Sequence, residues 1–101
     1  MKINKIHNAK RGEPDFTFYC PGCKCDHGIW IPYEGCTHAT WDFNGDLERP
    51  TVRPSILVNA GGLNPTQPIC HSFVTDGMIQ YLSDCTHELS GKTIELPEYD
   101  N

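Results

Sequence analysis

The sequence predicts a mostly β protein, a small β-sheet or β-sandwich-like domain with a zinc knuckle and a β-hairpin and at most one short helical turn. Three observations lead to this class. Short runs rich in aromatic and β-branched residues alternate with turn residues, and eight prolines and nine glycines divide the 101-residue chain. Six cysteines are several times the ordinary usage. Two of them flank Pro-Gly in the segment Cys20–Cys23, a spacing typical of a metal knuckle.

The first half of the chain predicts short strands separated by turns. Residues 15–20 (DFTFYC) alternate in hydrophobicity and lead directly into the Pro-Gly turn. A second short strand is expected at 29–31, and a third at 41–43, where Asn44-Gly45 favours a tight turn. The prolines at 50 and 54 exclude a helix over 50–55, but a strand is expected at 55–58, followed by a loop over 60–68.

The second half contains the clearest local signal, a hairpin. Asp76-Gly77 separates two apolar-rich runs, 70–75 and 78–82, and therefore predicts a two-residue turn. In that register Thr75 pairs with Met78, and the open end of the hairpin places Cys70 and His71 near the segment that follows the second strand. A helical turn over 86–91 and a last strand over 92–96 are expected to complete the domain.

Length and charge limit the class of protein. The chain is expected to be one domain over residues 1–101, with a partly flexible N-terminal segment at 1–14 and a C-terminal tail at 98–101. A net charge of −5 argues against nucleic-acid binding. The N-terminal stretch lacks the apolar run of a secretory signal, and no apolar stretch reaches the length of a membrane span. We therefore expect a cytoplasmic protein of the host cell, whose cysteines bind metal.

The hairpin indicates where the other two metal ligands lie. Because neighbouring residues of a strand face opposite sides, only one of Cys70 and His71 is expected to bind. The preferred Zn²⁺ ligands have thiolate or imidazole donors and are Cys20, Cys23, Cys70 and His87, with His71, Cys85 and His27 as alternates. Cys25 with His27 forms a competing local pair. Iron remains an alternative to zinc at such a site.

No catalytic residue is assigned from sequence. Both HExxH and GxSxG are absent, so the familiar motifs of zinc proteases and serine hydrolases give no support. A closed structural zinc favours a non-enzymatic module that binds a host or phage macromolecule. The alternative is a small zinc-dependent hydrolase with an open metal position. Its acid and base candidates are His27, His71, Asp84 and Glu88, with the Pro-Thr and Pro-Ser segments at 50–51 and 54–55 as its pocket wall.

Three motifs in order carry a resemblance to a known family. They are FYCPGCKCDH, WDFNGDLERPTVRPSI and CHSFVTDGMIQYLSDCTHELSGKTIELP. Together they resemble a family of small phage and prophage proteins whose members are often labelled "ammonia monooxygenase". The resemblance implies shared positions at the cysteines 20, 23 and 70, at the histidines 27, 71 and 87, and at the pairs Pro50-Thr51 and Pro54-Ser55. The resemblance supports a metal site but implies no activity. The oxygenase label has no physical support, because the sequence offers no 2-His-1-carboxylate facial triad.

Overall fold

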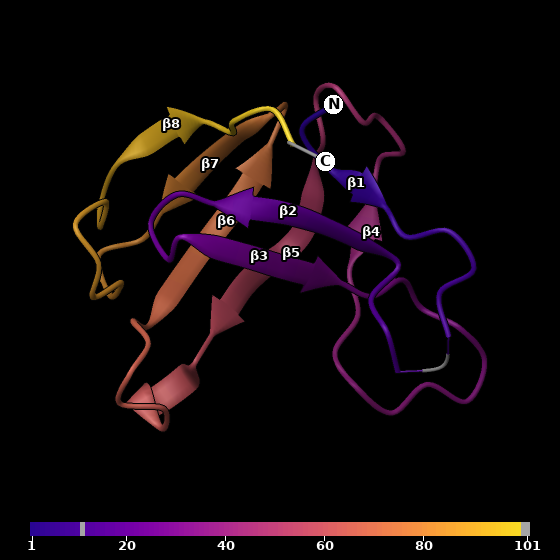
Figure 1. Cartoon of the computed structure of the whole chain (residues 1–101), viewed down its shortest axis with the longest axis horizontal. Coiled ribbons are helices and arrows are strands. Elements are labelled where there is room, and N and C mark those ends of the chain that lie inside the picture. The colour runs from indigo at the N-terminus through magenta and orange to yellow at the C-terminus, as the bar shows by residue number, and fades with distance from the viewer. Residues whose placement is uncertain (11, 100–101) are drawn as a thin grey trace.

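The computed structural model describes residues 1–10 and 12–99 and consists of two antiparallel sheets. Figure 1 shows β2 and β3 crossing in front of β5 and β6. The first sheet has the order β1-β2-β3, with β1 at Asn4–Lys5, β2 at Phe16–Cys20 and β3 at Cys25–Ile29. The second has the order β4-β5-β6-β7-β8, and its bounds are Asp42–Phe43, Val52–Val58, Cys70–Thr75, Met78–Tyr81 and Thr93–Glu95. The predicted mostly β class is therefore confirmed.

The core lies between the two sheets. Phe18 and Ile29 from the first sheet and Val52, Val74 and Ile79 from the second are fully buried. Burial alternates along β6, where Cys70, Ser72 and Val74 are buried and the residues between them are only partly buried. Successive side chains of β6 therefore point alternately into the core and toward the outer face of the second sheet.

The predicted hairpin is confirmed in position and register. Thr75 pairs with Met78 and Val74 with Ile79. Both turn residues have positive φ, 49° at Asp76 and 79° at Gly77, as a two-residue hairpin turn requires. The strands expected at 15–20, 41–43 and 92–96 are present within those limits as β2, β4 and β8.

Other boundaries differ from the sequence-based expectation. The strand expected at 29–31 is wrong, because β3 runs from Cys25 to Ile29 and pairs with all of β2, so that the Cys-Pro-Gly-Cys segment is itself a hairpin turn. The expected strand at 55–58 begins three residues earlier, at Val52, and its pairing with β6 is irregular between Val52 and Ile56. The expected helical turn at 86–91 is a run of turns, and the 60–68 loop contains a short 3₁₀ segment, η1, at Ala60–Gly62.

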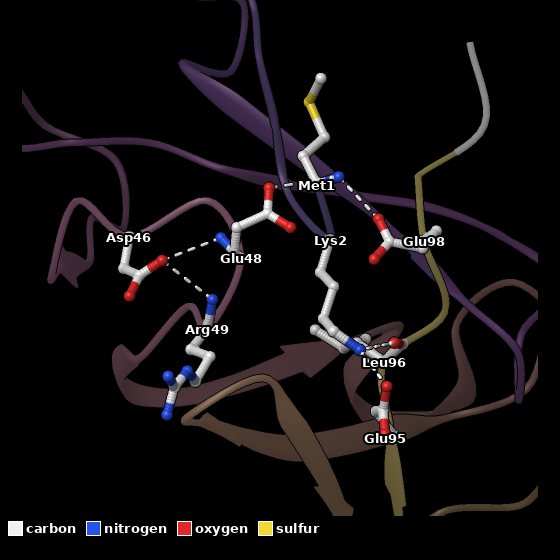
Figure 2. A network of polar contacts seen from close by, with 8 residues as sticks. All are labelled: Met1, Lys2, Asp46, Glu48, Arg49, Glu95, Leu96 and Glu98. Carbon is white, nitrogen blue, oxygen red and sulfur yellow. Dashed lines mark hydrogen bonds and ion pairs between the residues drawn. The ribbon is translucent and has the colours of Figure 1, made fainter.

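Polar contacts join the first residues of the chain to the last described ones, as Figure 2 shows. Lys2 Nζ lies 2.5 Å from a carboxylate oxygen of Glu95 and donates to the carbonyl of Leu96 at 2.8 Å. The amino group of Met1 donates to Glu98 at 2.6 Å. The tail expected at 98–101 lies partly outside the described residues, which end at 99. Within the described part of the chain, no helix has the length and apolar character needed to cross a membrane.

Candidate catalytic and metal sites

A serine, a histidine and an aspartate form a continuous chain of polar contacts on the outer face of the second sheet. Ser55 Oγ on β5 lies 3.0 Å from His71 Nε2 on β6. His71 Nδ1 lies 2.9 Å from Asp84 Oδ2, in the turn after β7. Because a carboxylate only accepts, Nδ1 carries a proton and donates to Asp84. This leaves Nε2 of the neutral ring as the acceptor for the Ser55 hydroxyl, which is the arrangement of a Ser-His-Asp triad.

The strand pairing explains why these residues meet. Leu57 pairs with His71, so both face outward, and Ser55 is two residues from Leu57 on the same strand face. Ser55 and His71 are half-buried, whereas Asp84 is exposed. The imidazole of His71 is therefore partly buried on the face of the sheet, while the carboxylate that accepts its hydrogen bond comes from an exposed turn.

Two side chains hold the main chain at Ser55 and at His71. The Cys85 thiol lies against the backbone of His71, whose N–H donates to Sγ at 3.2 Å while the thiol donates back to its carbonyl oxygen at 3.2 Å. On the other side, Trp41 Nε1 donates to the carbonyl oxygen of Ser55 at 3.2 Å. Because each contact is to the main chain, it fixes the strand from which the side chain of Ser55 or of His71 projects.

Sequence reasoning found this constellation only in part. The sequence predicts His71 and Asp84 as acid and base candidates of a zinc hydrolase, and it places Ser55 only in the expected pocket wall. His27 and Glu88, the other candidates, take no part in the hydrogen bonds between the three triad residues. The pairing of β5 with β6 is the signal that joins Ser55 to His71. That pairing spans a register shift, which the local sequence pattern does not reveal.

A second cluster lies on the core side of the same sheet. The ligand atoms of Cys20, Cys23, Cys70 and His87 all lie within 4.8 Å of one another, so these residues could hold a metal ion. The Sγ atoms of Cys20 and Cys70 are 4.0 Å apart, and Cys70 Sγ is 3.4 Å from His87 Nε2. These are the four residues that the sequence places first among its expected ligands.

Hydrogen bonds converge on the sulfur of Cys20. The N–H of Gly22 donates to the phenol oxygen of Tyr81 at 3.3 Å, and the phenol lies 3.2 Å from Cys20 Sγ. The N–H of Cys23 also donates to that sulfur at 3.4 Å. A hydrogen bond from Cys70 is the main cause that lowers the pKa of the Cys20 thiol to about 3, and His27 contributes. Burial raises the pKa of Cys23 to about 12, so the site favours one thiolate before any cation arrives.

Gly22 leaves the space that the imidazole of His87 occupies. A Cβ atom at position 22 would lie 2.5 Å from Nε2 and 2.7 Å from Nδ1 of that ring, closer than real Cβ contacts come. The ring also stands edge-on to Tyr81, with centroids 4.6 Å apart and an interplanar angle of 83°. Position 22 therefore requires glycine, because a larger residue would occupy the space of the His87 ring.

The alternate ligands have other positions. His71 belongs to the Ser-His-Asp arrangement, and Cys85 contacts the backbone of His71. His27 is buried at 4% exposure and packs edge-on against Phe18. Cys25 pairs with Cys20 across the β2–β3 hairpin but is exposed. None of these four belongs to the group of ligand atoms found among the described residues.

Comparisons with known proteins identify the family. The model of the bacterial ubiquitination-like system serine protease family (BubE) matches residues 2–82, which is most of the chain. Neither the curated proteins nor the solved structures give a match. The matched segment includes Ser55 and His71 and ends two residues before Asp84. On this match, the chain belongs to the family of bacterial ubiquitination-like system serine proteases.

Proposed function

We propose that this protein is a serine protease in which Ser55 is the nucleophile, His71 the general base and Asp84 the residue that orients the base. The observation that carries the proposal is the unbroken pair of contacts, Ser55 Oγ to His71 Nε2 at 3.0 Å and His71 Nδ1 to Asp84 at 2.9 Å. Both distances lie within the range of a nucleophile and base ready for proton transfer. The family description supports the same reaction class.

The mechanism follows from the proton positions. Ser55 Oγ attacks the substrate carbonyl carbon while His71 Nε2 takes its proton, and Asp84 stabilises the imidazolium that forms. His71 then gives this proton to the leaving group as the bond to the carbonyl carbon breaks, which leaves an acyl-Ser55 ester. Water attacks that ester, again with His71 as base, and releases the acid and free Ser55.

We further propose that the metal is zinc and that its role is structural. Three thiols and one imidazole within 4.8 Å match the Cys₃His set that zinc prefers. Four protein donors complete a tetrahedral shell, which supports a closed site over the open position of a zinc hydrolase. The residues fit the ion, and the chemistry of Ser55 and His71 needs no step through it.

Its biological role is proposed from the family description. The protein would cleave acyl bonds within a bacterial ubiquitination-like system, and its partner would then be a protein substrate. We prefer this enzymatic role to that of a non-enzymatic binding module, because a binding module has no need of a Ser-His-Asp arrangement.

Labelling with a small fluorophosphonate, followed by peptide mass spectrometry, tests the proposal. We expect the reagent to modify Ser55, because it reacts with a serine that a neighbouring base has activated. Ser55→Ala should abolish labelling, and Ser83→Ala, at an exposed serine in the turn after β7, should leave it intact. A folded, metal-loaded protein that is not labelled at Ser55 would contradict the assignment.

A further inference from the structure

A cavity is lined by two tryptophans, one just after the end of β3 and one just before the start of β4. It has a volume of about 280 Å³ and is lined by Gly12, Trp30, His38, Ala39 and Trp41. The two indoles have ring centroids 6.3 Å apart and are inclined by 34°. The volume is slightly smaller than that of typical small-molecule pockets, which suits one side chain better than an entire ligand.

The polar atoms of this cavity already have partners. Trp30 Nε1 donates to the carbonyl of Gly12 at 3.2 Å, and Trp41 Nε1 donates to that of Ser55 at 3.2 Å. His38 Nδ1 lies 3.0 Å from the carbonyl oxygen of Ala39 and therefore donates to it. With these N–H groups paired, the indole faces that line the cavity offer mainly apolar contact.

Trp41 joins the cavity to the nucleophile. Its ring is a wall of the cavity, and its N–H holds the main chain of Ser55. Strand β4 pairs with β5 only at Val52 and Arg53, so the indole meets the edge of β5 just beyond the last paired residue. The cavity wall is therefore continuous with the strand that carries the reactive hydroxyl.

We infer that this cavity, the Trp30–Trp41 pocket, is the subsite that binds an apolar side chain next to the scissile carbonyl of the substrate. The inference rests on the proposed function of Ser55. A bulky apolar side chain would leave water and pack in the pocket against the two indoles while the carbonyl lies at Ser55 Oγ. Burial of one such group typically changes kcat/KM about 10- to 100-fold.

N-acetyl amino acid p-nitrophenyl esters that differ only in side chain test this subsite. We expect the full-length protein to hydrolyse the leucine and phenylalanine esters about 10- to 100-fold faster in kcat/KM than the glycine ester. Ala39→Trp should fill the pocket and remove this preference, and Ala39→Leu should reduce it. Both variants should retain fluorophosphonate labelling of Ser55. Ala60→Trp, at an exposed alanine in η1, serves as the matched control and should keep the preference.

The outcomes separate the subsite from the proposed function. Labelling of Ser55 with no preference among the esters, or a preference that survives Ala39→Trp and Ala39→Leu, overturns the subsite and leaves the serine protease proposal standing. Absence of labelling in the folded wild-type protein overturns both.

Discussion

Cys70 and His71 are consecutive residues of β6 that serve opposite faces of one sheet. The sulfur of Cys70 lies on the core side, 3.4 Å from His87 Nε2, whereas His71 Nε2 lies on the outer side, 3.0 Å from Ser55 Oγ. This arrangement is possible because successive side chains of a strand point to opposite faces of the sheet. The two sites are therefore only one peptide bond apart along the chain. A displacement of β6 would therefore disturb both.

The triad predicts a large loss of activity from small changes at its second and third members. Asp84→Asn preserves shape but removes the charge that selects the His71 tautomer, so kcat should fall by about 10⁴-fold with little change in KM. His71→Ala should have a similar effect. Steady-state hydrolysis of an activated ester measures both. Glu88→Gln, in the same exposed loop, is the control and should be near wild type; equal activity of Asp84→Asn and wild type would exclude the triad.

The metal cluster predicts that loss of one buried thiol destabilises the whole domain. Structural zinc contributes on the order of 10 kcal/mol of apparent free energy in small domains, comparable with total domain stability. Cys20→Ser should therefore yield protein without metal and without a cooperative thermal transition. Plasma mass spectrometry and circular dichroism measure these properties. Cys25→Ser is the matched control, because Cys25 pairs with Cys20 across the hairpin yet is exposed. A Cys20→Ser protein with normal metal content and melting temperature would refute the site.

The Gly22→Ala substitution tests the metal site by steric displacement, because it changes none of the four donor residues. The added methyl group of Gly22→Ala would collide with the His87 ring and displace it from the other three donors. We expect metal affinity to fall as far as it does in His87→Ala, measured by competition with a chromophoric chelator. Because both changes act on one contact, the double variant should lose no more affinity than His87→Ala alone. Additive losses would show that Gly22 acts by another route.

Replacement of Ser72 by alanine is expected to stabilise the folded protein. Ser72 is fully buried on β6, and its Oγ has no hydrogen-bond partner among residues 1–10 and 12–99. A buried polar atom in this state costs about 1–3 kcal/mol, so Ser72→Ala should raise the free energy of unfolding by about 1 kcal/mol in urea titrations. Ser83→Ala, at an exposed position, should change it by less than about 0.5 kcal/mol. A destabilised Ser72→Ala variant would indicate that the hydroxyl has a partner.

The sequence predicts the local features of this protein better than the non-local ones. Asp76-Gly77 specifies the hairpin because its turn chemistry is contained in two residues. The register of that hairpin places one of Cys70 and His71 near Cys85 and His87. With the Cys-x-x-Cys knuckle this makes Cys20, Cys23, Cys70 and His87 the first-choice ligand set, although the sequence leaves the choice within each pair open. The metal itself remains a prediction.

Ser55 could not be assigned in the same way. Its place beside His71 depends on the pairing of β5 with β6, across a loop of eleven residues between Val58 and Cys70 and a register shift. Two prolines near Ser55 also obscure the start of β5 in the sequence. The triad thus uses no contiguous motif, and the absence of GxSxG said nothing about a serine that projects from the middle of a strand.

The adjacency of the two sites on β6 bears on how an assay would classify this protein. Enzymes are commonly sorted by inhibitor, with serine-directed reagents and chelators taken to mark separate mechanistic groups. If the proposed ion is bound at Cys70, a chelator that strips it would release the strand that carries His71, and the proposed hydrolase would lose activity although its mechanism takes no step through the metal. Sensitivity to both reagents is thus expected of a single hydrolytic mechanism.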